Sequence, residues 1–377
     1  MSHFFSDALF HILMGQPLKG LGVQMRFDPI DKNVRIIGRT KSCNKILYLS
    51  YSCSAIEFKF EGTKAEVVIQ SQFVEGDSSH RAWLAVVLNT DTEPIKRFNP
   101  HPGTHTYTLY EGTEKRSVII RLVKMSEAAF DKVGIEAIIT DNDIPIIPTQ
   151  EMERKIEFIG DSITCGYGVE GLNEIDLFDT IQENPWKAYA ARTARILKAE
   201  YHLVSWSGIG IISSWIPEDE DKPLEEPLMP DLYQYTDKAL DQAMGLSDYE
   251  KWDTNKFVPD CIVVNLGTND MSYTRGMKDR IDTFGKAYAD FIKDIRDKNP
   301  YASILCVLGV MGQELFPEIE SQISRLRSKD ENIYSHQLKL QLEADGIGTE
   351  GHPSLRTHEK LAEDLSNTIR KIMNWNQ

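Results

Sequence analysis

Four short segments of the chain carry residue types that can perform or assist acyl transfer. The first is Gly160-Asp161-Ser162, which directly follows an apolar run and leads into further glycines. A serine just past a buried strand can expose its hydroxyl at a helix N-terminus, where the helix dipole favours developing negative charge. The same position also suits an ordinary helix N-cap, with the glycines making the turn. The segment alone leaves both interpretations open.

The other three segments contribute Gly208, Asn269 and His352. Gly208 follows an apolar run, and by itself it indicates an ordinary strand-to-helix connection. Asn269 offers a neutral amide donor or, alternatively, the side chain of an Asx-turn. His352 directly precedes the last predicted helix, so backbone holds it in place, although a lone histidine there would usually be structural. Each segment has a structural explanation when it is taken alone.

The elements that position these residues alternate along the second part of the chain. Short apolar runs predict strands over Arg154–Ile159, Tyr201–Trp206, Asp260–Leu266 and Ser303–Leu308. Three- and four-residue spacing predicts helices over Pro185–Ala199, Arg280–Lys298 and around Leu361, Leu365, Ile369 and Ile372. Strands alternating with helices indicate a parallel sheet covered on both faces. In such sheets the active site lies beyond the carboxyl ends of the strands, where Ser162, Gly208 and Asn269 are expected.

The first ~140 residues show the two-residue alternation of strands instead. Turn-like segments such as Glu61-Gly62-Thr63 and His101-Pro102-Gly103 separate the runs. The pattern predicts an antiparallel β-sandwich or jelly roll made of short strands: Ala55–Phe60, Ala65–Gln70, Ala82–Leu88, His105–Tyr110, Ser117–Val123 and Ile135–Thr140. We therefore expect a β-sandwich domain over 1–145, a proline-containing linker over Asp141–Glu153, and an α/β domain over 154–377.

Taken together and in order, the four segments resemble the signature blocks of the SGNH (or GDSL) hydrolase family. Their longer wording, above all Gly160-Asp161-Ser162-Ile163-Thr164-Cys165-Gly166-Tyr167-Gly168 and Asn265-Leu266-Gly267-Thr268-Asn269-Asp270, looks most like carbohydrate esterase family 2. That resemblance implies a jelly-roll domain followed by a flavodoxin-like, three-layer α/β domain. It implies a serine esterase of the acetyl xylan esterase type, acting without a metal or other cofactor on acetylated xylan- or mannan-type carbohydrates.

The resemblance also implies roles for the matched residues. Ser162 would be the nucleophile and His352 the general base. The oxyanion would be held by the backbone N–H groups of Ser162 and Gly208 and by the side-chain amide of Asn269.

One position departs from the common family pattern. Many SGNH enzymes place an aspartate three residues before the histidine, where this chain has Thr349. Glu350 is the predicted orienter of His352, with Asp345 as a second candidate. The resemblance also allows a dyad in which a backbone carbonyl orients the histidine. Among nearby aromatic residues, Trp215 and Tyr167 are the predicted sugar contacts, against the alternative of a core role.

Composition limits the partners and the compartment. The net charge of -15 argues against a nucleic-acid partner. No apolar run approaches the ~18 residues of a membrane span, and Ala8–Met14 lacks the basic flank of a secretory signal. Five scattered cysteines without zinc-type spacing indicate buried thiols in a reducing compartment, so we expect a cytoplasmic protein. Self-association into a homo-oligomer stays open. The alternative functions are a carbohydrate-binding protein with a silent SGNH domain and an SGNH esterase for another acyl ester.

Overall fold

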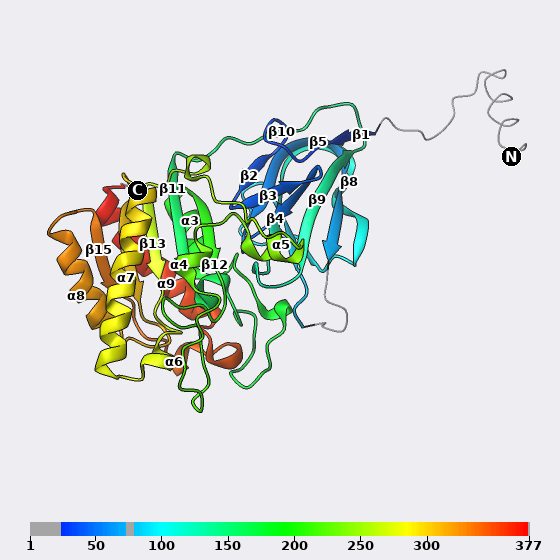
Figure 1. Ribbon diagram of the computed structural model, residues 1–377. Coiled ribbons are helices and arrows are strands. Elements are labelled where there is room, and N and C mark those ends of the chain that lie inside the picture. The colour runs from blue at the N-terminus through cyan, green and yellow to red at the C-terminus, as the bar shows by residue number, and fades with distance from the viewer. Residues whose placement is uncertain (1–23, 73–78, 376–377) are drawn as a thin grey trace, which may run out of the picture.

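The computed structural model describes residues 24–72 and 79–375, so the run Ala8–Met14 lies outside the described residues. An antiparallel sheet formed by the N-terminal part lies beside a parallel sheet formed by the C-terminal part (Figure 1). This confirms the predicted order of an antiparallel and then a parallel unit.

The antiparallel sheet has ten strands, with the main order β3-β4-β9-β5-β8-β6-β7. Strands β1 and β10 pair with β9 and β5, and β2 also pairs with β5. The strands are β1 (Met25–Phe27), β2 (Arg35–Ile37), β3 (Thr40–Cys43), β4 (Ile46–Leu49), β5 (Ala55–Gln72), β6 (Leu84–Leu88), β7 (Lys96–Phe98), β8 (Gly103–Lys124), β9 (Lys132–Thr140) and β10 (Ile147–Pro148).

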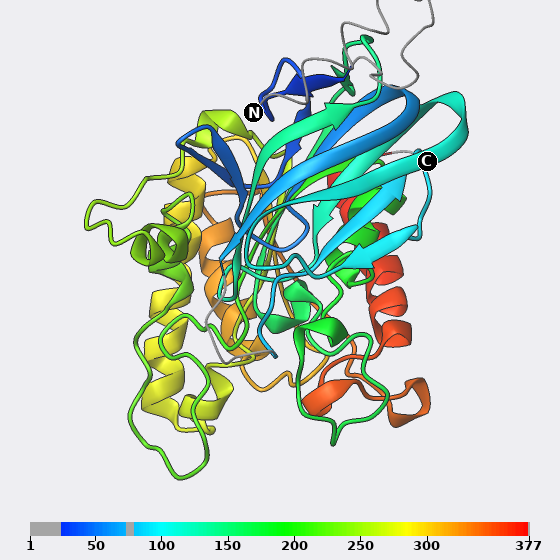
Figure 2. The ribbon, with the colours of Figure 1, turned by 90° about the vertical axis from the view of Figure 1, so that its right-hand side faces the viewer.

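Two of these strands are much longer than the sequence pattern predicts. Strand β5 has 18 residues and β8 has 22, and Figure 2 shows both as long curved ribbons. The predicted turn at Glu61-Gly62-Thr63 is wrong, because this segment lies inside β5. The pairing with β8 shifts register between Gly62 and Lys64, so a β-bulge absorbs the turn-like residues without ending the strand.

The parallel sheet has five strands in the order β12-β11-β13-β14-β15. They are β11 (Arg154–Gly160), β12 (Ala199–Ser205), β13 (Cys261–Asn265), β14 (Ser303–Leu308) and β15 (Ile333–Gln337). Gly160 at the end of β11 pairs with both Ser205 of β12 and Asn265 of β13. The segments that follow these three strands therefore meet at one edge of the sheet, as predicted.

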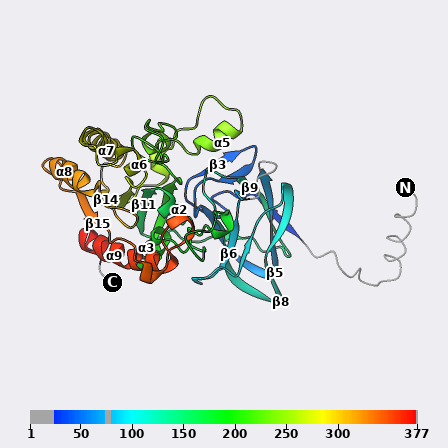
Figure 3. The same ribbon diagram turned by 90° about the horizontal axis from the view of Figure 1, so that it is seen from below.

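Helices contact both faces of the parallel sheet. Cys261 and Val263 of β13 belong to the core that includes α3 and α9, whereas Ile262 and Val264 belong to the core that includes α7 and α8. Figure 3 shows these two pairs of helices on opposite sides of the strands. The α-helices are α2 (Ser162–Cys165), α3 (Tyr189–Leu197), α4 (Met229–Leu232), α5 (Lys238–Ala243), α6 (Met271–Thr274), α7 (Lys278–Lys298), α8 (Phe316–Arg327) and α9 (Leu355–Met373).

Helix α3 is shorter than predicted at both ends. It begins at Tyr189 rather than near Pro185, and Ala199 is already the first residue of β12. Lys198 has a φ of 51°, and this left-handed conformation ends the helix before the strand begins.

The two sheets share buried contacts. Val123 and Met125 of the N-terminal part pack in the same core as Ile156 and Phe158 of β11. Arg39, with no exposed surface, donates to the carbonyl oxygens of Tyr233 and Tyr235 and pairs with Glu157 at 3.2 Å. The interface thus contains both apolar side chains and a buried ion pair.

All five cysteines are free, and Cys53, Cys165, Cys261 and Cys306 are buried, whereas Cys43 is half-buried. In the described part of the chain, no helix has the length and apolar character needed to cross a membrane.

Candidate active site

Ser162 is the first residue of helix α2, at the carboxyl end of β11. The N-cap of α2 is Asp161, whose side chain accepts a hydrogen bond from the N–H of Ile163, so the N-cap interpretation of Ser162 is wrong. Ser162 is buried, and its Oγ lies 2.9 Å from Nε2 of His352. The fold therefore brings a serine hydroxyl and an imidazole into direct contact across 190 residues of sequence.

The surroundings of His352 keep its ring neutral. Nδ1 lies 3.2 Å from the backbone carbonyl oxygen of Thr349. A proton on Nδ1 satisfies this contact and leaves Nε2 free to accept from Ser162. Burial lowers the pKa of His352 to about 4, although hydrogen bonds with the backbone of Thr349 and Glu350 and the charge of Glu350 oppose the shift. At neutral pH this histidine is an unprotonated base.

The side chain of Glu350 does not lie at Nδ1 of His352, in contrast to the sequence expectation. Its Oε2 accepts from the hydroxyl of Tyr167 at 2.7 Å, and its Oε1 accepts from the N–H of Phe178 at 3.3 Å. Glu350 has a φ of 52°, so the backbone turns at this residue and its carboxylate is exposed. The nearest orienting group is instead the carbonyl of Thr349, as in the dyad that the sequence left open.

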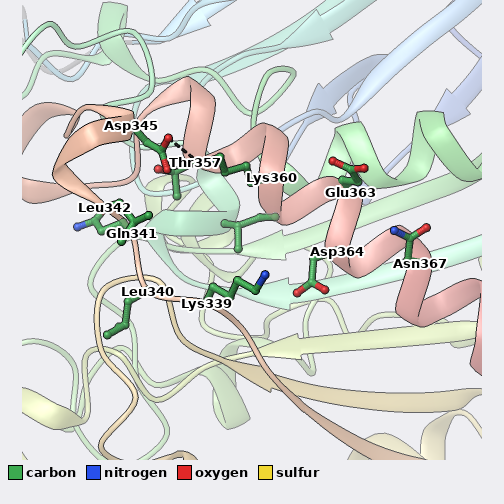
Figure 4. A pocket seen from close by; sticks show the side chains of 11 residues that line it. Lys339, Leu340, Gln341, Leu342, Asp345, Thr357, Lys360, Glu363, Asp364 and Asn367 are labelled. Atoms are coloured by element: carbon green, nitrogen blue, oxygen red, sulfur yellow. Dashed lines mark hydrogen bonds and ion pairs between the residues drawn. The ribbon is translucent and has the colours of Figure 1, made fainter.

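Asp345, the second candidate orienter, lies away from the histidine. Its carboxylate pairs with Lys360 of α9 at 2.6 Å, an interaction drawn in Figure 4. Both residues line a cavity of about 440 Å³ between α9 and the segment from Lys339 to Leu342. Ser162, His352 and Glu350 do not line this cavity.

Gly208 lies in a tight turn that follows β12. The N–H of Ile209 donates to the carbonyl of Trp206 at 3.3 Å, and Gly208 has a φ of 77°. This conformation is accessible to glycine at little cost. No atom lies within 4 Å of the position that a Cβ of Gly208 would occupy, so this face of the turn is open.

Asn269 links the segments that hold the other two oxyanion-hole candidates. Its Nδ2 donates to the carbonyl of Ile209 at 2.9 Å and lies 3.4 Å from Oδ2 of Asp161. These contacts place the amide between the residue after Gly208 and the residue before Ser162. The structure thus gathers Ser162, Gly208, Asn269 and His352 at one sheet edge.

Asp270 supports the same edge, and no role was predicted for it. Its carboxylate accepts hydrogen bonds from the N–H groups of Ile211, Ile212 and Ser213, at 2.8–3.2 Å. Burial raises its pKa to about 6 and that of Asp161 to about 7. The adjacent position of Asp270 in the Asn269 segment was the only sequence signal for this role.

The two predicted sugar contacts differ in their surroundings. The side chain of Trp215 is exposed (58%), and its backbone N–H donates to the carbonyl of Gly208 at 2.8 Å. Tyr167 stacks on Phe178, with ring centres 3.6 Å apart, and its ring lies 4.3 Å from that of His352. The indole of Trp215 is therefore accessible to solvent near the turn, whereas the ring of Tyr167 packs beside His352.

A buried polar cluster behind the site was not predicted. Glu127, Cys165 and Glu183 are fully buried, and one potential metal-ligand atom from each lies within 4.8 Å of the others. Glu127 belongs to the segment between β8 and β9, and its Oε2 accepts from the N–H of Ser207 at 2.7 Å. These residues are distant in sequence and form no motif, so only the fold brings them together.

Comparisons with known proteins agree with this arrangement. Residues 158–347 match the GDSL-like lipase/acylhydrolase family, and residues 36–149 match the N-terminal domain of carbohydrate esterase 2. The structure of a family two carbohydrate esterase from Clostridium thermocellum, solved in complex with cellohexaose, is 31% identical. The match covers 91% of this chain and 100% of that one, with a TM-score of 0.79.

This chain belongs to carbohydrate esterase family 2. It is 32% identical over 332 residues to the cellulase/esterase CelE of Acetivibrio thermocellus, which covers 86% of the chain but 38% of CelE. It is 26% identical to an acetylxylan esterase / glucomannan deacetylase of Cellvibrio japonicus, over 92% of this chain and 90% of that protein. Family 2 esterases are carboxylic ester hydrolases, which confirms the predicted enzyme class and family.

Proposed function

We propose that this family 2 esterase removes O-acetyl groups from xylan- or mannan-type oligosaccharides and polysaccharides. The observation that carries the proposal is the 2.9 Å contact between Oγ of Ser162 and Nε2 of a neutral, buried His352. A serine paired with an unprotonated imidazole is the arrangement that nucleophilic acyl transfer requires.

The proposed reaction has two steps. Nε2 of His352 takes the proton of the Ser162 hydroxyl as Oγ attacks the acetyl carbonyl carbon. The tetrahedral intermediate collapses, the C–O bond to the sugar breaks, and His352 gives the proton to the leaving sugar oxygen. Water then attacks acetyl-Ser162 with His352 as base, which releases acetate and restores the serine.

The proposed oxyanion hole consists of the N–H groups of Ser162 and Gly208 and the side-chain amide of Asn269. These donors are neutral and are fixed by the fold before the reaction starts. Preorganised donors stabilise charge that appears only in the transition state, which accelerates the chemical step. One N–H of Asn269 is held by the 2.9 Å bond to the carbonyl of Ile209, and the second, whose contact with Asp161 is long at 3.4 Å, is the one assigned to the oxyanion.

We also infer the finer architecture from family membership. The parallel sheet with α3 and α9 on one face and α7 and α8 on the other supports a three-layer, flavodoxin-like SGNH domain. The curved antiparallel sheet is assigned as the jelly-roll unit of the family.

The carbohydrate part of the proposal is supported by Trp215 and by the relatives. An exposed indole beside the Gly208 turn suits the apolar face of a sugar ring. One relative is named an acetylxylan esterase / glucomannan deacetylase, and another was solved with cellohexaose. The cellohexaose complex of that relative also favours a second candidate function, non-hydrolytic binding of β-glycans.

The test compares four substrates: acetylated xylo-oligosaccharide, acetylated glucomannan oligosaccharide, 4-nitrophenyl acetate and a feruloyl ester. The proposal expects acetate release from at least one sugar substrate. It also expects Trp215→Ala to raise KM for that sugar while leaving 4-nitrophenyl acetate unaffected. Hydrolysis of only the feruloyl ester would contradict the proposed substrate. Binding of cellohexaose by calorimetry without hydrolysis of any ester would favour the second candidate.

A further inference from the structure

We propose that Glu127 is a positioning residue for the oxyanion hole. It belongs to the N-terminal part of the chain, yet its Oε2 accepts a 2.7 Å hydrogen bond from the N–H of Ser207, directly before Gly208. This inference rests on the proposed esterase function. In this proposal the contact between the N-terminal and C-terminal parts of the chain holds a group that acts in catalysis.

The turn that Glu127 holds determines where the N–H of Gly208 points. Trp206 to Ile209 form a four-residue turn closed by the Ile209 N–H, with Gly208 at its third position and a φ of 77°. A positive φ at this position is typical of a type II turn. Type I and type II turns differ mainly in the orientation of their central peptide, which here is the Ser207–Gly208 peptide that carries the N–H of Gly208.

Two hydrogen bonds hold the peptides that precede and follow this central peptide in the chain. The N–H of Trp215 donates to the carbonyl of Gly208 on one side, and Glu127 accepts from Ser207 on the other. No atom lies within 4 Å of the Cβ position of Gly208, so no side chain packs against the turn there. The carboxylate of Glu127 therefore restrains the peptide where packing does not.

The surroundings of Glu127 favour this role over a purely structural one. The ammonium group of Lys124, itself fully buried, donates to the backbone carbonyls of Glu127 and Ser50 at 2.9 and 2.7 Å. The nearby Lys124 charge and the Ser207 N–H both stabilise the ionised carboxylate, against the effect of burial. Burial raises the pKa of Glu127, and it raises the pKa of the neighbouring Glu183 well above its usual range, with the charge of Glu127 adding to that second shift.

A cation held by Glu127, Cys165 and Glu183 is the competing explanation of the cluster. The thiol of Cys165 donates to Oγ of Ser205 at 3.2 Å, and burial raises its pKa well above the usual range. A zinc ligand would have to be the thiolate. The hydrogen bonds therefore favour a protonated thiol and a carboxylate that serves the turn.

The experiment uses the full-length chain with Glu127→Ala, Glu127→Gln and, as a matched control, Glu183→Gln. With 4-nitrophenyl acetate, Glu127→Ala should lower kcat by about 10- to 100-fold with KM changed less than about 2-fold, since misplacement by about 1 Å can cost 10²-fold. Glu127→Gln keeps an oxygen acceptor and should recover most of the loss. Glu183→Gln removes a buried carboxyl of the same cluster without touching the turn, and should stay within about 2-fold of wild type.

A second measurement separates this proposal from the proposed function. Amide hydrogen exchange should show the N–H of Ser207 protected in wild type and in Glu127→Gln, and exchanging faster in Glu127→Ala. Protection together with an inactive wild type would refute the esterase function while leaving the turn contact in place. The proposal is overturned by unchanged kcat in Glu127→Ala, by equal losses in Glu183→Gln, or by one equivalent of zinc whose removal abolishes activity.

Discussion

Nδ1 of His352 lies 3.2 Å from the backbone carbonyl oxygen of Thr349, so a peptide group occupies the place that an acid holds in a catalytic triad. Glu350 precedes His352 by two residues but directs its carboxylate at Tyr167. The orientation of His352, the proposed base, therefore depends on the loop backbone rather than on an ionised side chain.

The first prediction concerns Glu350. Glu350→Gln should lower kcat by less than about 10-fold, whereas loss of a true triad acid typically costs about 10⁴. The residual effect comes from the lost charge near the imidazole and from the altered contact with Tyr167. Steady-state kinetics on 4-nitrophenyl acetate measures this, and a loss of about 10³ or more would place Glu350 in the catalytic machinery.

The second prediction concerns pH. A protonated imidazole cannot accept the proton of Ser162, and burial lowers the pKa of His352 to about 4. Because a lowered pKa keeps the base unprotonated in more acidic solution, kcat/KM should stay level from neutral pH down to about pH 5 and fall as pH passes through about 4. The profile is measured by acetate release. The same acidic limb should persist in Asp161→Asn, and a limb at or above pH 6.5 would contradict the assignment.

The third prediction concerns the oxyanion hole. Asn269→Ala removes the amide donor and should lower kcat by about 10²–10³. KM should change little, because the interaction forms only in the transition state. Kinetics on both 4-nitrophenyl acetate and the best sugar substrate check this, and a rise in KM without a fall in kcat would assign Asn269 to substrate binding instead.

The fourth prediction concerns the contact between the two sheets. Arg39→Leu leaves the buried carboxylate of Glu157 without its cationic partner, and such losses cost about 3–5 kcal/mol in the free energy of unfolding. The exposed pair of Arg26 and Glu136 provides the control, and Arg26→Ala should cost less than about 1 kcal/mol. Denaturant unfolding measures both variants. Equal effects would show that the buried pair adds no special stability.

Much of the fold and part of the site could be predicted from the sequence, because local patterns encode them. Apolar runs predicted the strands β11, β13 and β14. The glycine-containing segments that follow three of the strands indicated which edge of the sheet carries the site. The motif residues Ser162 and His352 were visible for the same reason. Helix α8 was also detectable, since Phe316, Ile319 and Ile323 follow helical spacing and Pro317 suits its first turn, but it was not predicted.

The remaining features depend on groups that leave no signature in the sequence. Every residue has a backbone carbonyl, so nothing identified that of Thr349 as the partner of His352. Glu127 reaches the Ser207 turn from the segment between β8 and β9, 80 residues away along the chain. The residues around Gly62 are typical of a turn, yet β5 continues through them because they pair with β8. Long-range contacts decided each of these points.

The central claim is that the reaction passes through an acetyl group on Oγ of Ser162. The most direct test is acetate release from 4-nitrophenyl acetate and acetylated xylo-oligosaccharide by wild type and Ser162→Ala, with EDTA present, combined with mass spectrometry of rapidly quenched wild-type enzyme. We expect metal-independent activity and an acetylated peptide containing Ser162 in wild type, and we expect the activity and the acetylation to be absent in Ser162→Ala. Esterase activity that survives in Ser162→Ala would contradict it.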